Sequence, residues 1–384
     1  MPQQYPLAAV LTDNCLDCIP WNYHPPLSHN FKLDQNQSLL SGAAFLYLFF
    51  AISLGVLIVA EYMMAMATSI QADSPSTSSD SQGQTFTSMY AVPFTVTKGT
   101  ETFTVREARR DELGDIGWVA AEAFINNAMA YYFSGTTKPM QVTDKSALRS
   151  LYEFYYFLFK TCAIGGGRAV VAVSESKTDS DLSKNRIAAA ACWYPPGKRI
   201  KTMNALRGGI VRCLWNWGFQ GFDRMANEYT KITHGTFKRS FDSRAIEIPA
   251  ASMRKGGGKK ISLKESDSWY LQAMFSSKRF EGRGLMATLM REGYAYAHRK
   301  APGIPITLDA TSARARDRYM HLGYELMEPV TIIGAGKATP IGLSPSNKTE
   351  KRKRQAELTG VPYWCMVNWD PSRLLEIESQ ERKL

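Results

Sequence analysis

Apolar and polar residues follow two different periods along residues 102–369. Alternating or continuous short apolar runs predict strands, and apolar positions three and four residues apart predict amphipathic helices. The runs predict strands at residues 102–108, 168–174, 186–193, 269–275, 306–310 and 363–369. Helices are expected at 110–124, at 146–162, over about 17 residues after Gly284, and briefly around Tyr319. This order predicts an α/β (α+β) domain with helices flanking a mixed central sheet.

An uncharged apolar segment precedes this domain. Residues 42–60 contain 19 residues without a charge and are followed by Glu61. That length is sufficient to cross the hydrocarbon of a bilayer as a helix. We predict one transmembrane helix there, with a buried hydrophobic helix or a leader segment as the alternatives. Residues 1–41 are then a polar N-terminal segment and 61–101 a Ser/Thr-rich linker, so the folded domain is expected to cover 102–384.

Two long irregular stretches interrupt the domain. Residues 194–267 separate two predicted strands, and their first part has a helical texture, whereas 254–260 form a basic glycine-rich run. Long insertions in compact domains are commonly functional. We expect the helical part to form a pocket wall and the basic run to be mobile. Within 334–360, the basic run 351–354 is interpreted as a solvated loop, with a nuclear signal or acidic-lipid contact as alternatives.

Charge and cysteine content narrow the function classes. The chain has a net charge of +11, but residues 1–97 hold one basic and six acidic residues, so residues 98–384 carry +16. Such a domain attracts polyanions. The six cysteines are scattered and do not suggest a disulfide framework. Cys15 and Cys18 have metal-site spacing but no second ligand pair, so we expect no metal.

The most informative motif lies between the strand at 269–275 and the helix that follows. It reads Arg279-Phe-Glu-Gly282-Arg283-Gly284. The N–H groups at a helix start have no intrahelical partners, and the helix dipole makes that end positive. Gly282 and Gly284 allow close approach, so the turn is suited to a diphosphate. About 40 residues further on, Tyr319 precedes a Leu-Gly-Tyr step that contains Gly323.

Together these segments resemble the GNAT-type acyl-CoA N-acyltransferase superfamily over about residues 102–369. The glycine turn corresponds to the family's pyrophosphate motif, and the Tyr319 segment to the end of its fold. The resemblance implies acetyl-CoA as co-substrate, held by Arg279, Gly282, Arg283, Gly284 and Leu285. For Arg283, a phosphate contact and a solvent-facing side chain are equally compatible with the sequence.

The resemblance also assigns roles along the predicted strand. The Gln272 N–H would face the thioester carbonyl, and Met274 would pair with the pantetheine arm. Tyr319 would protonate the departing thiolate, although a purely structural tyrosine is the alternative. The general base is variable in this family. Asp309 is our first candidate, ahead of Glu122 and His321.

The sequence therefore predicts direct N-acetylation of an amine on a small or medium-sized molecule, without a covalent intermediate. Similar fungal chains belong to secondary metabolism or detoxification. Lys32 alone would favour an inside N-terminus, whereas acetyl-CoA use favours a single-pass membrane protein with a cytosolic catalytic domain. No nucleic acid partner is expected. The rival hypothesis is a non-catalytic protein of the same fold whose basic face binds nucleic acid or acidic lipid.

Overall fold

A computed structural model describes residues 90–176, 186–244, 247–248 and 261–373. The predicted membrane segment 42–60, Cys15, Cys18 and the basic run 254–260 lie outside these ranges. Within the described residues, no helix combines the length and apolar character that a membrane crossing requires.

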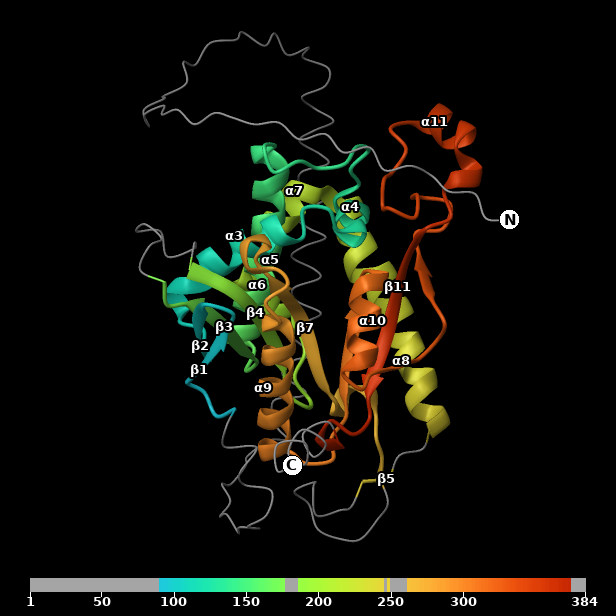
Figure 1. The fold of residues 1–384 in the computed structure, drawn as a ribbon. Helices are drawn as coiled ribbons and strands as arrows, with labels where there is room; N and C mark the ends of the chain where they lie inside the picture. The colour runs from blue at the N-terminus through green and yellow to red at the C-terminus, as the bar shows by residue number, and fades with distance from the viewer. Residues whose placement is uncertain (1–89, 177–185, 245–246, 249–260, 374–384) are drawn as a thin grey trace, which may run out of the picture. The chain divides into compact units, whose positions relative to one another are not determined.

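A nine-stranded sheet organises the domain (Figure 1). Its strand order is β1-β2-β3-β4-β7-β8-β11-β10, and β9 pairs with β11. All neighbouring strands are antiparallel except β7 and β8, which are parallel. A separate two-stranded sheet consists of β5 (Glu247–Ile248) and β6 (Ile261–Ser262). The bounds of the main strands are β1 Phe94–Lys98, β2 Glu101–Glu107, β3 Arg168–Ser174, β4 Ile187–Tyr194, β7 Trp269–Ser276, β8 Ile306–Ala310, β9 Glu325–Leu326, β10 Thr331–Ile333 and β11 Val361–Asn368.

Helices cover both faces of the sheet. On β4, Cys192 faces α5 and Trp193 faces α9, since Cys192 interacts with Cys162 of α5 whereas Trp193 lies against Gly293 of α9. Successive strand residues point to opposite faces, so α5 and α9 lie on opposite sides. The helices are α3 Leu113–Ala123, α4 Ala128–Ser134, α5 Lys145–Ile164, α6 Thr202–Gly208, α7 Ile210–Phe222, α8 Thr230–Arg244, α9 Leu285–Lys300, α10 Ala313–His321 and α11 Lys348–Lys353.

Local signals explain where several helices begin. The Asp144 side chain accepts hydrogen bonds from the N–H groups of Ser146 and Ala147, at 3.0 Å each, and so caps α5. Ser312 caps α10 through the N–H of Ala315 at 3.2 Å. These caps fix the first turns of two helices that border the site described below.

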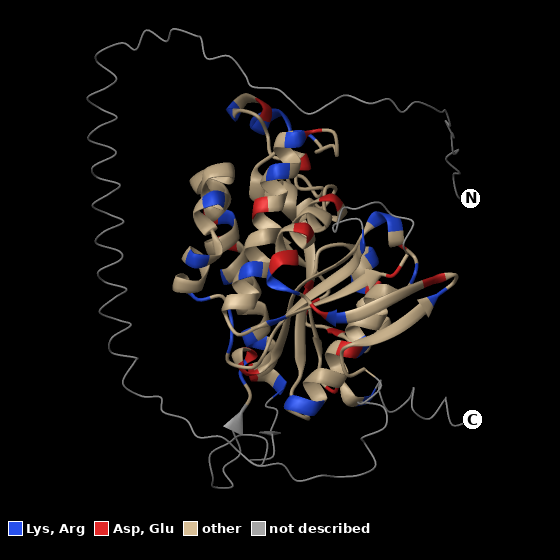
Figure 2. Cartoon of the chain, turned by 90° about the vertical axis from the view of Figure 1, so that its left-hand side faces the viewer, with Lys and Arg blue, Asp and Glu red and all other residues tan. Residues whose placement is uncertain are grey.

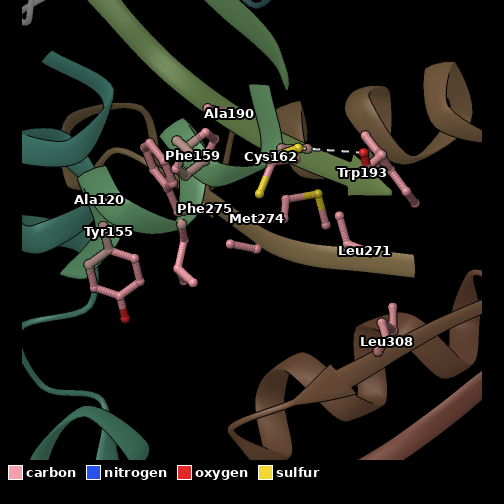
Figure 3. Close-up of a cluster of buried hydrophobic side chains, with 14 of the residues drawn as sticks. Ala120, Tyr155, Phe159, Cys162, Ala190, Trp193, Leu271, Met274, Phe275 and Leu308 are labelled. Carbon is pink, nitrogen blue, oxygen red and sulfur yellow. Dashed lines mark hydrogen bonds between the residues drawn. The ribbon is translucent and has the colours of Figure 1, made fainter. Parts of the chain in front are cut away.

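The core beneath β7 joins the sheet to α5 (Figure 3). The rings of Phe159 and Phe275 meet edge to face at 6.0 Å, and the Cys162 thiol donates to the carbonyl oxygen of Trp193 at 3.5 Å. Met274 is also buried in this core. β7 also pairs with β4 from Tyr270 to Ser276, with one register shift between Leu271 and Ala273.

The structure corrects one predicted boundary. The folded domain begins before Thr102, because β1 lies within the stretch that we assigned to the linker and pairs along its whole length with β2. The two strands are joined at Gly99, whose φ of 62° a glycine adopts readily. Threonines alternate with apolar residues in β1, so its composition resembles a linker although its period is that of a strand.

The insertion has the helical character that we predicted. After β4 it forms α6, α7, a π-helical turn η4 (Asp223–Tyr229) and α8. The basic run at 351–354 is partly helical, since α11 ends at Lys353, and Arg354 forms ion pairs with Glu350 and Glu357.

Candidate active site

A large cavity of about 1530 Å³ lies along β7 and β8. One group of its lining residues comes from β7, the turn before α9, the end of β8 and α10. The other group comes from α4, α5, α6, α7, η4 and α8. The helical insertion therefore does form a wall of this cavity, as predicted.

The strands β7 and β8 separate at the cavity. Their parallel pairing covers Trp269–Leu271 and Ile306–Leu308 and ends there, although β7 continues to Ser276. The pairing of β7 with β4 skips Gln272, because Leu271 pairs with Trp193 and Ala273 with Cys192. Such a bulge leaves the extra residue outside the regular ladder. The exposed edge of β7 thus offers backbone groups that an extended ligand can pair with.

Gln272 and Met274 both line the cavity from this edge. The side chain of Met274 is buried, so the backbone is what this residue presents to a ligand. The specific roles of their N–H and C=O groups toward a thioester and a pantetheine arm remain predictions.

The glycine turn closes one end of the cavity. Gly282 and Gly284 have φ values of 83° and 71°, and no described heavy atom lies within 4 Å of the position where a Cβ would stand on either. The N–H of Thr288 donates to the Gly284 carbonyl at 3.2 Å. The N–H groups of Leu285 and the two residues after it precede that bond, so the helix gives them no acceptor.

Charge at this end is also favourable to an anion. The exposed side chains of Lys278 and Arg318 line the cavity, and the carboxylate of Glu281 in the turn is paired with Arg314 at 2.7 Å. Open space, three N–H groups at a helix start and two cations suit a diphosphate. The residues present therefore fit the phosphate end of an acyl-CoA.

Two predicted phosphate ligands lie elsewhere. Arg283 forms an ion pair with Glu101 of β2, with 3.3 Å between Nε and Oε2. The guanidinium of Arg279 lies over the ring of Phe280, 5.1 Å from its centroid. Neither residue lines the cavity. The Arg283 side chain is exposed, which agrees with the solvent-facing alternative, and its ion pair with Glu101 was not expected from the sequence.

Tyr319 lines the cavity from α10 and is 7% exposed. Its ring meets that of Tyr324 edge to face at 5.7 Å. Burial raises the pKa of the Tyr319 phenol above its ordinary value, so the hydroxyl keeps its proton at neutral pH. The hydroxyl can therefore donate a hydrogen bond inside the cavity, and its action as an acid toward a thiolate remains a prediction.

Asp309 lines the cavity from the end of β8 and is held by two tyrosines. Its Oδ2 accepts hydrogen bonds from the hydroxyls of Tyr229 and Tyr270, at 2.9 Å each. Its buried Oδ1 has no hydrogen-bond partner among the described residues. Burial raises the pKa of Asp309, and the hydroxyls of Tyr270 and Tyr229 together with the Cys365 thiol lower it without cancelling that effect. A carboxylate with one unpaired buried oxygen and a raised pKa is suited to accept a proton.

A second polar group lies in the same part of the cavity. Glu265 accepts from His234 Nδ1 at 3.1 Å and from Arg199 at 3.0 Å. Burial opposes ionisation of Glu265, but His234 and Arg199 together lower its pKa. The same hydrogen bond raises the pKa of His234. Glu265 therefore remains charged and pairs with both neighbours.

Sequence reasoning missed most of this polar group. Tyr229 and Tyr270 are 80 and 39 residues from Asp309 along the chain, and no local spacing connects them. Of the other base candidates, His321 lines the cavity as an exposed side chain, whereas Glu122 does not line it. The four described cysteines are buried and free.

No protein-family model matches this chain, and no curated protein matches it significantly. Solved structures do resemble it. A Corynebacterium glutamicum protein described as a histone acetyltransferase and related acetyltransferase has 18% identity and a TM-score of 0.37, covering 69% of this chain and 95% of its own. An agmatine N-acetyltransferase has 13% identity and a TM-score of 0.39, with 69% and 98% covered. A putative arylalkylamine N-acetyltransferase from the mosquito Aedes aegypti has 9% identity and a TM-score of 0.40, with 69% and 86% covered.

These identities and TM-scores are low, so the structural matches carry no argument about this chain. The strand order, the separation of β7 from β8 and the bulge at Gln272 occur together with the glycine turn at the start of α9. Tyr319 and Gly323 follow after β8. These features agree with the fold that the resemblance to the GNAT-type acyl-CoA N-acyltransferase superfamily implies.

Proposed function

We propose that this protein transfers an acetyl group directly from acetyl-CoA to an amine. The observation that carries the proposal is a single cavity that joins three features. They are the unpaired edge of β7 from Gln272 onward, the glycine turn at Gly282–Gly284, and the carboxylate of Asp309. A diphosphate site, a strand-like groove and a base in one cavity are what acetyl transfer requires.

Each of these residues would have one role in the reaction. Acetyl-CoA supplies an already reactive thioester. The Gln272 N–H would donate to the thioester oxygen as negative charge develops there. Asp309 would accept the proton that the attacking amine loses. Tyr319 would donate its hydroxyl proton toward the sulfur.

No covalent enzyme intermediate is needed in this scheme. The four described cysteines are buried, and burial raises the pKa of the Cys192, Cys213 and Cys365 thiols. A buried thiol with a raised pKa is a poor nucleophile. Direct attack by the amine on the thioester is therefore the simpler route.

The lining supports an acceptor with an apolar or aromatic body. The side chains that line the part of the cavity away from the glycine turn are mostly aromatic or aliphatic, among them Phe133, Phe154, Leu206, Ile210 and Phe222. Apolar walls with a few placed polar groups are typical of small-molecule sites. The carboxylates of Asp309 and Glu265 would orient the amino end. The same proposal includes a role in secondary metabolism or detoxification. It also includes tethering of a cytosolic catalytic domain to a membrane by residues 42–60.

The direct test is turnover of acetyl-CoA with a panel of amines, followed by detection of the released thiol. We expect aromatic and aliphatic primary amines to react, and Asp309→Asn to abolish most turnover while acetyl-CoA affinity is retained. Lack of thiol release with any amine, despite CoA binding, would instead favour the non-catalytic rival. On the side shown in Figure 2, basic positions are spread over several elements with acidic ones between them, whereas nucleic acid binding is associated with clustered basic residues.

A further inference from the structure

The outer surface of α6 and α7 carries four large apolar side chains that are mostly exposed. Their exposed fractions are 56% for Met203, 57% for Val211, 89% for Trp215 and 69% for Phe219. We name these four residues the α6–α7 apolar face. Val211 and Trp215 are four residues apart and share one side of α7. Phe219 follows the break at Gly218, whose φ of 65° interrupts the helix.

The other side of α7 is already engaged with the domain. Trp217 is buried, with its ring 4.6 Å from that of Phe154, and Cys213 is buried as well. Ile210 and Leu214 line the cavity. The helix is therefore apolar on both sides, and helices of that kind are normally covered on both sides.

Basic residues predominate along α6 and α7. Residues 195–222 contain five basic residues and no acidic one. Lys198, Lys201, Arg207 and Arg212 are exposed, and Arg212 also forms an ion pair with the buried Glu153 of α5, at 3.5 Å. Figure 1 shows α11 at the same end of the domain as α7, and α11 adds further exposed lysines and arginines.

We propose that the α6–α7 apolar face rests on the surface of a lipid bilayer that contains anionic headgroups. Trp and Phe at an interface, with Lys and Arg around them, are typical of helices that lie in the headgroup region. A second copy of this chain is less suited than a bilayer to cover the α6–α7 apolar face, because a two-fold contact would bring the same basic residues of both copies together. The predicted membrane segment at 42–60 would bring the domain near such a surface, but the proposal rests on residues 198–219 alone.

The test uses the full chain in lipid nanodiscs. Residues 42–60 are themselves predicted to hold the chain on the disc, so the measurement must report on α6 and α7 alone. Discs of phosphatidylcholine are compared with discs in which about a third of the lipid is phosphatidylserine. We expect amide hydrogen exchange of α6 and α7 to slow by roughly tenfold on the anionic discs. Trp215 emission, isolated by subtracting the Trp215→Phe spectrum, should be quenched by brominated lipid on those discs.

The variant Val211→Ser/Trp215→Ser/Phe219→Ser should lose the slowing of exchange, whereas the control Ile332→Ser, which changes another exposed apolar residue (41%), should keep it. Unchanged acetyl-CoA binding verifies that each variant is folded. Equal exchange on both kinds of disc overturns the proposal. Protection that increases with protein concentration in lipid-free detergent also overturns it, since it indicates a second copy.

Discussion

Removing one hydroxyl next to Asp309 gives the sharpest test of its role as the base. Tyr270→Phe deletes a 2.9 Å hydrogen bond to Oδ2 and leaves the ring in place. A hydrogen bond to a charged group contributes about 1.5–3 kcal/mol, and one pKa unit corresponds to about 1.4 kcal/mol. Loss of this bond destabilises the ionised form of Asp309, so its pKa should rise by about one to two units.

The assay is the pH dependence of kcat/KM. A base must be deprotonated to act, so activity falls as pH decreases through its pKa. The acidic limb should therefore move to higher pH by about one to two units in Tyr270→Phe, and Asp309→Asn should lower kcat/KM by roughly 10²–10⁴-fold. The control is Tyr363→Phe, because the Tyr363 hydroxyl pairs with Thr233 at 3.0 Å and not with Asp309.

The acceptor also titrates, so the profile is measured with two amines of different pKa. A limb that moves with the amine belongs to the substrate, and a limb that stays belongs to the enzyme. If Asp309→Asn retains most of the activity, or if the enzyme's limb is the same in Tyr270→Phe as in Tyr363→Phe, Asp309 is not the base.

Three further outcomes are expected. Gly282→Glu should weaken CoA binding by roughly tenfold or more in calorimetry. The control Gly303→Glu should not weaken it, although Gly303 has a similar positive φ of 75° and equally open surroundings. Equal losses of CoA affinity in the two variants would mean that backbone strain alone is responsible. Tyr319→Phe should lower kcat about 10- to 100-fold with little change in acetyl-CoA affinity, and the loss should shrink at low pH; intact turnover would make the tyrosine structural. A chain that starts at Ser79 should unfold at higher temperature than one that starts at Lys98, because the shorter chain lacks most of β1. Equal melting temperatures in calorimetry would show that β1 contributes nothing to the stability of the domain.

Local periodicity was sufficient for the elements that border the phosphate end of the site. The predicted strand at residues 306–310 has the same limits as β8, and the predicted strand at 269–275 differs from β7 by one residue. Both are short apolar runs bounded by turn residues, where the period is clear. The positive φ values at Gly282 and Gly284 agree with the glycine spacing, because few other residues adopt that conformation easily.

Two kinds of feature could not be predicted in this way. β1 was assigned to the linker because threonine-rich composition outweighed a five-residue alternation. The hydrogen bonds of Asp309 with Tyr229 and Tyr270 depend on pairing and packing between distant segments. The ion pair of Arg283 with Glu101 is of the same kind, since it depends on how closely the turn approaches β2.

The two ends of the cavity have different origins in the chain. The glycine turn, the edge of β7 and Tyr319 belong to the core of the fold, and in the proposed function they would serve the co-substrate. Tyr229 and His234 come from the long insertion, and they reach Asp309 and Glu265 from the opposite wall. An insertion can vary without disturbing the sheet, because it is connected to it only at its two ends. Acceptor recognition should therefore reside mainly in residues 194–267. The same helices that line the cavity carry the exposed α6–α7 apolar face, so contact with a bilayer and access to the acceptor site would be controlled by one segment.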